Sequence, residues 1–531
     1  MNDKIYYNGT ILTMENPLYV EAIFIKDGII KKVGYTDEVF KLKTDNTKII
    51  DLQGKTLMPS FIDSHSHMTA VANTLGLVNL TNAKNFDDII KKIKDFKSSK
   101  SLNDHEWIIG FGYDNNSLVE KQIPTKDILD KASKSNPILI SHTSGHMGCV
   151  NSIALEKLNI TNTTKNPEGG FIGKLPNSNE PNGYLEENAF IQNTKNVPKT
   201  SLETMDKFIQ EAQDIYLSYG ITTCQDGFVG NNEFDNLKFV SDNNKLKIDV
   251  VGYIDLKSCK SIMDENTQYS KEYVNRLKLG GYKIFLDGSP QGKTAWLTKP
   301  YEKSKDGYRG YPIYKDFEVK TFVRTALSEN MQLLSHCNGD AAADQLISSF
   351  NEVLKLGKYT KNTRPVMIHA QTIRYDQIDE MKKIGMIPSY FVAHVYYWGD
   401  IHIQNLGEER ASIISPAKTT LDKGVPFTFH QDSPVVPPNM LHTIWCAVNR
   451  ITKNGVLLGE HERISPLDAL KAITINSAYQ YFEENIKGSL KEGKLADLVI
   501  LDKNPLEVDP MEINDIRVLE TIKEGQTLYL N

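Results

Sequence analysis

Hydrophobic and polar residues alternate near both ends of the chain in the manner of β-strands. Residues 22–34 contain two apolar runs on either side of Asp27-Gly28, a pair that strongly favours a β-hairpin. Residues 495–501 and 519–529 show similar short apolar runs near the other end. Since the middle of the chain follows a different pattern, we predict one small sheet domain assembled from both ends.

Between these ends, apolar strand-like runs alternate with helical patterns. Apolar residues recur with helical spacing from about residue 202 until Gly220, and residues 221–225 then resemble a strand. Further strands are expected at 282–286, 332–336, 366–369, 387–390 and 426–430, with helices at 317–329, 341–356 and 375–384. Repeated βα units with apolar strands indicate a parallel sheet, which is either a closed (β/α)₈ barrel or an open doubly wound sheet.

The stretch from about residue 115 to residue 200 does not follow this rhythm. It is rich in Asn, Gly and Pro, as in residues 166–170 and 177–183. We interpret it as a loop-rich insertion that carries loops over a functional site. The alternative is a disordered excursion on the surface.

Length, charge and cysteine usage narrow the class of protein. A chain of 531 residues exceeds the usual size of one core, so two or more domains are expected. A net charge of −6 with both signs interspersed argues against a nucleic-acid partner. We expect neither a signal peptide nor a membrane span. The five cysteines are scattered without CxxC spacing, so we predict a cytoplasmic protein with free thiols.

Side chains that can bind transition metals stand at the ends of several expected strands. His65 and His67 close the apolar run at 58–67, and residues two apart on a strand point to the same face, so both imidazoles can reach one ion. The other candidates are Lys283, His336, His369 and Asp432. In a closed barrel the carboxyl ends of all strands converge on one face, whereas an open sheet would spread them along a line. Candidate ligands at the ends of so many strands therefore favour the barrel.

Each candidate also has an ordinary structural interpretation. A lone histidine at a strand end is more often simply hydrogen-bonded, and Asp432 could cap a helix. An unpaired ammonium group of Lys283 inside an apolar strand would be costly, so this lysine needs a partner or a chemical modification. It is improbable that all the ordinary interpretations hold together, in this order and at this spacing. Other histidines lie in polar or helical contexts and receive no role: His105, His402, His442 and His461.

Several motifs follow one another in a fixed order and together resemble a known enzyme family. They are Pro59-Ser-Phe-Ile-Asp-Ser-His-Ser-His67, Ser144-Gly-His-Met-Gly-Cys-Val-Asn-Ser152, Gly220-Ile-Thr-Thr-Cys-Gln-Asp226, Lys283-Ile-Phe-Leu-Asp-Gly-Ser289, His336-Cys-Asn-Gly-Asp-Ala341, Ile368-His-Ala370, Asp432-Ser-Pro434 and residues 488–502. The ordered set resembles the amidohydrolase superfamily, specifically its YtcJ-like branch, which includes N-substituted formamide deformylases. The HxH motif alone would be weak evidence.

The resemblance implies a fold and a domain organisation. The fold is a distorted TIM (β/α)₈ barrel over residues 58–486, carrying the loop-rich insertion at about 115–200. Residues 1–57 and 487–531 would form a composite β-sandwich domain.

The resemblance also implies a ligand set for divalent metal. A strand-borne lysine, here Lys283, would be carboxylated and bridge two ions. One ion would be held by His65, His67 and Asp432, and the other by His336 and His369. One departure is His430-Gln-Asp-Ser-Pro434, where related sequences often have Gly-Ser-Asp-Ser-Pro; a structural role for this extra histidine is slightly favoured.

Imidazole and carboxylate ligands suit zinc, with manganese, iron or nickel as alternatives, at one or two ions per chain. Such an ion would supply hydroxide at neutral pH to attack an amide-type carbonyl, and Asp432 would carry a proton from the water to the leaving nitrogen. The alternatives are a metal-dependent lyase or isomerase on the same scaffold, or a catalytically inactive scaffold protein.

The substrate is less well defined by the sequence. Five residues could give an aromatic, fairly apolar lining, although each could equally belong to the core: His146, Trp107, Tyr113, Phe391 and Trp398. An N-substituted amide or formamide is the best interpretation. The expected partner is therefore a small molecule, with neither nucleic acid nor membrane, and a homodimer is compatible with the fold.

Overall fold

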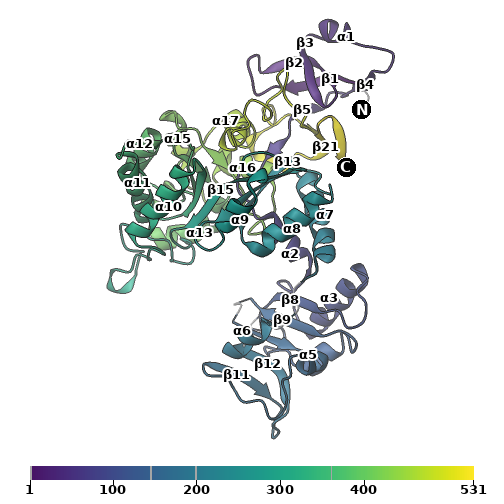
Figure 1. The fold of residues 1–531 in the computed structure, drawn as a ribbon, viewed down its shortest axis with the longest axis vertical. Coiled ribbons are helices and arrows are strands. Elements are labelled where there is room, and N and C mark those ends of the chain that lie inside the picture. Colours follow the sequence, from purple (N-terminus) through teal and green to yellow (C-terminus); the bar gives the residue numbers. More distant parts are fainter. Residues whose placement is uncertain (1–2, 116, 144–145, 196, 198–199, 360–361) are drawn as a thin grey trace. The chain divides into compact units, whose positions relative to one another are not determined.

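The computed structural model describes residues 3–115, 117–143, 146–195, 197, 200–359 and 362–531. The first two residues of the Ser144–Ser152 motif lie outside the described residues. The chain divides into two compact units (Figure 1). The larger unit combines Met1–Val71 with Ile209–Asn531, and the smaller one contains Ala72–Phe208.

Eight parallel strands form the central sheet of the larger unit. In spatial order they are β6 (Phe61–Ile62), β13 (Ile221–Val229), β14 (Asp249–Asp255), β15 (Leu277–Phe285), β16 (Gln332–Cys337), β17 (Val366–His369), β18 (Ile387–Tyr390) and β19 (Thr428–Phe429). Each strand pairs in parallel with its neighbour in this order. Helices connect successive strands, among them α7 (Leu202–Ser218), α8 (Asn231–Asp242), α10 (Asp316–Ser328), α11 (Asp340–Leu354) and α12 (Tyr375–Ile384).

The first and last strands of this sheet are joined at their carboxyl ends. The hydroxyl of Ser64, just after β6, donates a hydrogen bond of 2.8 Å to the carbonyl of Phe429 in β19. The backbone N–H of Asp432 donates to the carbonyl of His65 at 3.2 Å. The sheet is therefore closed into a distorted (β/α)₈ barrel at the end where strand-borne side chains converge.

The strands near the two termini form a separate eight-stranded sheet of the same unit. Its order is β22 (Gln526–Leu530), β21 (Val518–Lys523), β20 (Leu498–Leu501), β5 (Thr56–Pro59), β1 (Lys4–Leu12), β2 (Tyr19–Lys26) and β3 (Ile29–Gly34), with β4 (Lys48–Asp51) branching from β1. Asp27 and Gly28 make the two-residue turn of the β2–β3 hairpin, both at positive φ, as the type I′ geometry requires. Side chains from β1 to β3 and from β20 and β21 share one hydrophobic core, so the branched sheet folds around it.

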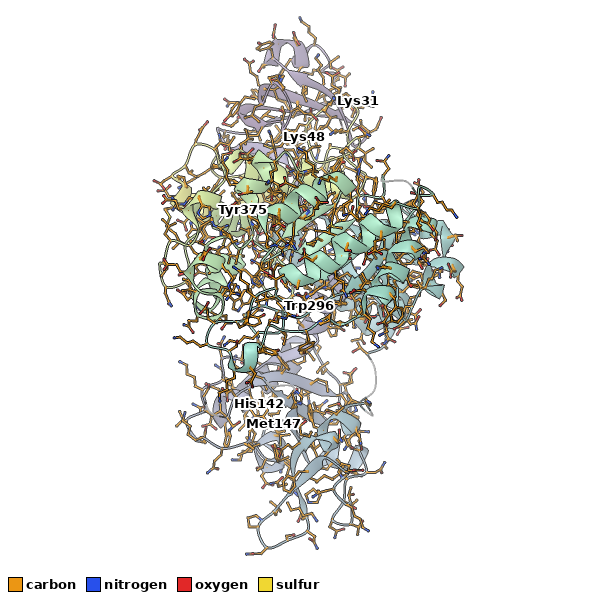
Figure 2. All side chains as sticks on the ribbon, turned by 90° about the vertical axis from the view of Figure 1, so that its left-hand side faces the viewer. Lys31, Lys48, His142, Met147, Trp296 and Tyr375 are labelled. Carbon is orange, nitrogen blue, oxygen red and sulfur yellow. The ribbon has the colours of Figure 1, made fainter. Side chains whose placement is uncertain are left out.

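The smaller unit is more ordered than its composition indicates. Its six-stranded sheet has the order β11 (Gly170–Lys174), β12 (Pro181–Glu187), β10 (Met147–Val150), β9 (Ile138–His142), β8 (Ile108–Tyr113) and β7 (Leu77–Asn79). It carries α3 (Phe86–Ser99), α4 (Lys126–Asp130), α5 (Ser152–Lys157) and α6 (Asn188–Thr194), and Figure 2 marks His142 on β9 and Met147 on β10. The loop-rich insertion expected at about 115–200 is thus part of an α/β unit over 72–208, because Asn, Gly and Pro occupy the turns between short buried strands.

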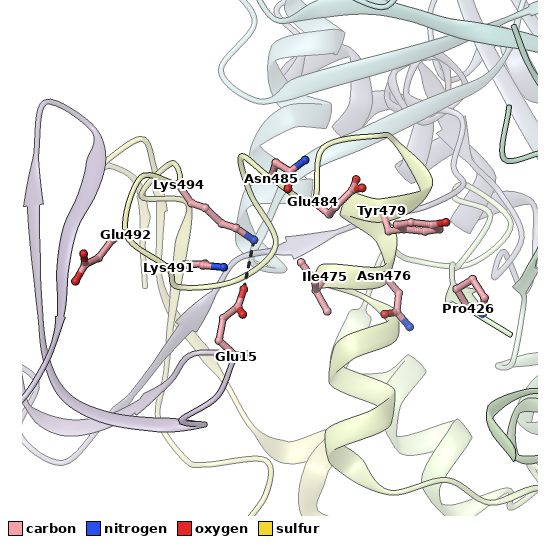
Figure 3. A pocket seen from close by; sticks show the side chains of 10 residues that line it. All are labelled: Glu15, Pro426, Ile475, Asn476, Tyr479, Glu484, Asn485, Lys491, Glu492 and Lys494. Carbon is pink, nitrogen blue, oxygen red and sulfur yellow. Dashed lines mark ion pairs between the residues drawn. The ribbon is translucent and has the colours of Figure 1, made fainter. Parts of the chain in front are cut away.

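No helix in the described ranges is both long enough and apolar enough to cross a membrane. A cavity of about 470 Å³ lies beside the amino end of β19, between Pro426 and the ion pair of Lys494 with Glu15, whose atoms are 3.6 Å apart (Figure 3). None of the candidate metal ligands lines it, because they lie at the opposite, carboxyl end of the strands.

Candidate metal centre

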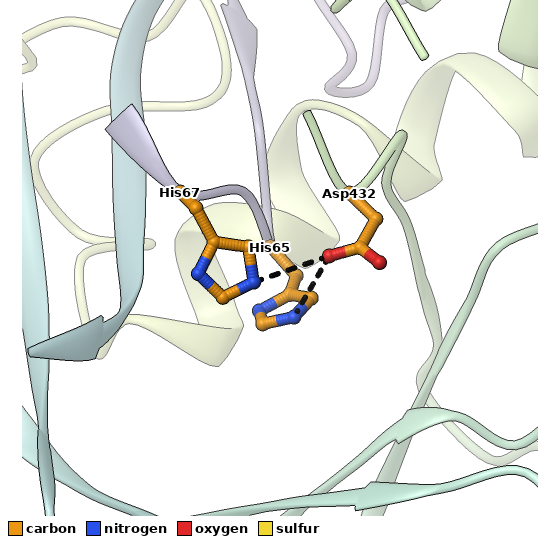
Figure 4. Close-up of side chains that lie close together, drawn as sticks. All are labelled: His65, His67 and Asp432. Carbon is orange, nitrogen blue, oxygen red and sulfur yellow. Dashed lines mark ion pairs between the residues drawn. The ribbon is translucent and has the colours of Figure 1, made fainter. Parts of the chain in front are cut away.

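Three candidate ligands converge just beyond β6 and β19 (Figure 4). The Nε2 atoms of His65 and His67 each lie 3.3 Å from Oδ1 of Asp432. One ligand atom of each residue lies within 4.8 Å of the others, which is the spacing that a single metal ion can bridge. Asp432 adopts a positive φ of 53°, and its backbone bond to His65 holds the carboxylate over the two imidazoles.

The tautomer of His65 leaves a lone pair on the nitrogen that faces Asp432. Its Nδ1 lies 2.5 Å from Oε1 of Gln225, whose amide nitrogen donates to the carbonyl of Ser64 and to the hydroxyl of Tyr481. These two bonds fix the amide orientation, so Oε1 is the acceptor and Nδ1 of His65 carries the proton. A metal-ligating histidine is held in this way through its second nitrogen.

The donor atoms of this trio fit a cation. Oδ1 of Asp432 is buried and accepts no hydrogen bond from the described residues, although two imidazole nitrogens are close to it. The lone pair of His65 Nε2 and this carboxylate oxygen repel each other across 3.3 Å unless a positive charge lies near both. Burial alone would raise the pKa of Asp432, but the neighbouring imidazole of His67 brings it below its usual value.

A second group of candidates adjoins the first. Nδ1 of His336, on β16, and Nε2 of His369, at the end of β17, are 3.1 Å apart. A single proton can lie between two such nitrogens, and an ion bound by both lone pairs would take its place. Burial lowers the pKa of His336 to about 4 and that of His369 well below its usual value, so both rings are neutral and able to act as ligands.

Lys283 of β15 connects the two groups. Its side chain is fully buried, and its Nζ lies 3.2 Å from Nε2 of His65. Within the described ranges no carboxylate oxygen comes within ion-pair distance of Nζ. Burial lowers the pKa of Lys283 to about 7, with Asp432 acting in the opposite direction, so a large fraction of the amine is uncharged at neutral pH.

The additional histidine, His430, supports His369. Its Nε2 lies 3.2 Å from Nδ1 of His369, and its own Nδ1 lies 2.9 Å from the hydroxyl of Ser389. The ring is fully buried, and burial lowers its pKa to about 3. His430 therefore orients the nitrogen of His369 that does not face Asp432, which is the usual position of a supporting group behind a metal ligand.

The loop that follows β15 is fastened to β16 beside His336. The buried carboxylate of Asp287 accepts backbone N–H bonds from Trp296, Asn338 and Gly339 at 2.9, 2.9 and 2.7 Å. Burial raises its pKa to about 7 against the effect of these bonds. Trp296 is marked in Figure 2.

The predicted substrate residues fall into two sets. Phe391 follows β18, and its ring centroid lies 5.4 Å from that of His430 and 5.8 Å from that of Trp398. The other three belong to the smaller unit, where Tyr113 is buried in one hydrophobic core, Trp107 packs against another, and His146 pairs with Glu187. Their part in substrate binding stays a prediction.

Sequence reasoning gave no role to several residues that shape this centre. Gln225 lies inside a motif that had been singled out, yet a glutamine in a buried strand carries no signal of histidine support. Asp63, two residues before His65, is fully buried, and burial raises its pKa to about 8. Ser389 was expected only as a strand residue. Such residues come close to the ligands only in the folded chain, so their spacing along the sequence gives no signal of this role.

Comparison with known proteins now identifies the family. The sequence model of the amidohydrolase family matches residues 48–529, which is nearly the whole chain. The chain belongs to the amidohydrolase family. Its distorted TIM barrel is the fold that the resemblance implied.

Individual relatives are similar to this chain over nearly its whole length. A putative amidohydrolase YtcJ of Bacillus subtilis is 27% identical over 99% of this chain and 99% of its own length. N-substituted formamide deformylase of Arthrobacter pascens is 24% identical over 100% of this chain and 98% of its own length. An uncharacterized metal-dependent hydrolase from Pyrococcus furiosus superposes with a TM-score of 0.78 at 26% identity, covering 95% of this chain and 100% of that chain. The family and these relatives support a hydrolase.

Proposed function

We propose that this protein is a metal-dependent hydrolase that cleaves the C–N bond of an N-substituted amide or formamide. The observation that carries the proposal is the convergence of His65, His67 and Asp432, whose ligand atoms lie within 4.8 Å of one another beside a buried carboxylate oxygen. The family and the relative named as a formamide deformylase support the bond type.

The residues divide into two ligand groups around Lys283. His65, His67 and Asp432 would hold one ion, and His336 and His369 would hold a second. The uncharged amine of Lys283 would form an N–C bond to CO₂ and release one N–H proton to solvent, which gives an anionic carbamate between the groups and also removes the cost of a buried ammonium. Divalent metal in such a site lowers the pKa of water toward about 7 and polarises a carbonyl oxygen.

Asp432 is the residue suited to move the proton. Because its pKa lies below the usual value, the carboxylate is ionised at neutral pH and can accept a proton from the attacking water. Its second oxygen, Oδ2, lies 4.0 Å from Nε2 of His369 and is therefore on the side of the second ligand group. After attack, the same carboxyl group can deliver the proton to the leaving nitrogen.

Aromatic rings lie beside the ligands and favour an apolar substituent on the substrate. The ring of Phe285 lies 5.2 Å from His336, and that of Phe228, which is 36% exposed, lies 4.9 Å from Phe285. The ring of Phe391 lies next to that of His430. Small formamides with an aliphatic or aromatic group on nitrogen would place that group against these rings.

The test is hydrolysis of a panel of N-alkyl and N-aryl formamides, with matched acetamides, by protein loaded with zinc, manganese or iron. We expect release of the amine and the free acid, and loss of turnover after chelation with recovery on adding metal. Conversion without a hydrolysed C–N bond would instead indicate the lyase or isomerase. A fully metal-loaded protein that converts no member of the panel would reject the proposed bond type.

A further inference from the structure

His394 and His402 form a buried histidine pair outside the proposed ligand set. Both belong to α13 (His394–Leu406), eight residues or about two turns apart along the helix. Nδ1 of His394 and Nε2 of His402 are 3.1 Å apart, and the two rings are within 6° of parallel. His394 is 4% exposed and His402 is completely buried.

The pair lies at the carboxyl end of the barrel strands. β18 carries no candidate ligand, but it lies between β17, which ends in His369, and β19. The ring of Phe391, the first residue past β18, is 5.4 Å from His430 and 4.7 Å from His394. Burial, His402, His430 and His336, in this order, lower the pKa of His394, so His394 is within electrostatic reach of the candidate centre.

The surroundings of His402 decide where the protons of the pair lie. Its Nδ1 is buried and has no hydrogen-bond partner among the described residues. A proton there would be a buried N–H without an acceptor, which is rarer and costlier than an unused lone pair. His402 therefore carries its proton on Nε2 and donates it to Nδ1 of His394.

This arrangement fixes the second nitrogen of His394 as a donor. Burial keeps both rings neutral, lowering the pKa of His402 to about 4 and that of His394 well below its usual value. A neutral imidazole that accepts a hydrogen bond at Nδ1 carries its one proton on Nε2. Within the described part of the chain, Nε2 of His394 makes no hydrogen bond.

We propose that Nε2 of His394 donates a hydrogen bond to the carbonyl oxygen of the substrate amide, and that His402 is a positioning residue that keeps the proton on that nitrogen. This inference rests on the proposed hydrolase function. A fixed neutral donor suits an oxygen whose negative charge grows as water attacks the carbon, so it stabilises the transition state more than the bound substrate.

The kinetic test compares His394→Phe, His402→Leu and the double variant on a formamide that the wild type hydrolyses. Phenylalanine keeps a ring against Phe391 and Trp398 but has no donor. We expect His394→Phe to lower kcat by about 100- to 1000-fold while KM changes by less than about threefold. His402→Leu should have a smaller effect, and the double variant should be no worse than His394→Phe. A change confined to KM, or losses that multiply in the double variant, would overturn the proposal.

The second test reads the tautomer without turnover. Protein labelled with [¹⁵N]histidine has twelve histidines, and the signals of His394 are those that His394→Phe removes from a long-range ¹H–¹⁵N correlation spectrum. We expect a protonated Nε2 and an unprotonated Nδ1 in the wild type, and a mixture in His402→Leu at unchanged metal content. A protonated Nδ1 on His394 would overturn the pair's assignment even in an active hydrolase. A wild type that hydrolyses no amide while showing the expected tautomer would instead reject the proposed function.

Discussion

Nζ of Lys283 lies 3.2 Å from Nε2 of His65, at a distance where the amine can donate to the imidazole lone pair. Another buried lysine of the same strand, Lys278, instead forms a close ion pair with Glu483. The two lysines are five residues apart on β15, so one faces the catalytic end of the barrel and the other its base. Of these two lysines, Lys283 is the one that has no carboxylate within ion-pair distance among the described residues.

This contrast predicts which lysine reacts with CO₂. Because burial lowers the pKa of Lys283 to about 7, its neutral amine is plentiful at pH 8 and scarce at pH 6. Metal-free protein under ¹³CO₂ should therefore show one carbamate carbon signal by NMR that grows between these pH values. Lys283→Met should remove the signal, and Lys278→Met is the matched control that should retain it. A signal that survives in Lys283→Met would contradict the assignment.

Asp432→Asn should separate metal binding from proton transfer. The amide oxygen can still approach the metal, but the side chain can no longer take up a proton at neutral pH. We expect metal content to fall modestly and kcat to fall by about 100-fold or more, as for loss of a general base. The measurement is kcat at matched metal occupancy. A variant that keeps near-wild-type kcat would show that another group is the base.

Gln225→Leu tests whether the support behind His65 matters to the metal. Without the acceptor at 2.5 Å, His65 can place its proton on Nε2 and lose the lone pair that faces Asp432. We expect about 10- to 100-fold weaker metal affinity, measured by competition with a chelator. Gln213→Leu is the matched control, since Gln213 is equally buried but bonds to the backbone of Lys247 and Ile248. Equal weakening in both variants would point to a general loss of stability.

A buried ion network near the base of the barrel predicts how stability depends on pH. Burial alone would raise the pKa of Asp249, but Lys487 at 2.5 Å and Lys523 at 2.7 Å bring it well below its usual value. The contribution of Asp249 to folding stability is fully present above its unfolded-state pKa of about 3.9. It is lost as the pH falls through the lower pKa that Asp249 has in the folded protein. Lys487 has a raised pKa, so its contribution is present below about pH 10.4 and is lost above it.

We therefore expect the free energy of unfolding in urea to change little between about pH 5 and 10 on account of this network, and to decrease below about pH 4. Asp249→Asn should lower it by about 3–5 kcal/mol at pH 7, because two ammonium groups lose their shared carboxylate. The exposed pair of Lys260 with Asp264 is the control, since Asp264→Asn should cost less than about 1 kcal/mol. Equal costs would mean that the network contributes no more than a surface pair.

Part of this fold could be predicted because hydrophobic period and turn residues act locally. The hairpin at Asp27-Gly28, the helix that ends before Gly220 and the strands at 366–369 and 387–390 all follow such local signals. The sequence pattern predicts neither the strand at 249–255 nor the helix at 231–242, and it predicts loops over about 115–200, where the structure has short strands and helices. There the strands are short, and Asn, Gly and Pro between them dominate the composition.

The candidate ligands could be foreseen because their residue types are rare at strand ends and a barrel brings such ends together. The residues that support these ligands could not be predicted from the sequence. Gln225, Ser389 and the His394–His402 pair are ordinary residues of strands and helices in sequence, and only packing places them behind or beside the ligands. Hydrogen-bond partners of this kind are set by tertiary distance rather than by spacing along the chain.

The proposed metal centre is tested most directly by measuring the metal content of protein purified without chelator or added metal, by plasma mass spectrometry. Two ligand groups around Lys283 predict close to two divalent ions per chain, and one fewer in His336→Ala than in the wild type. About one ion in both proteins would leave a mononuclear site at His65, His67 and Asp432. A chain that holds no metal, even after reconstitution, would contradict the account.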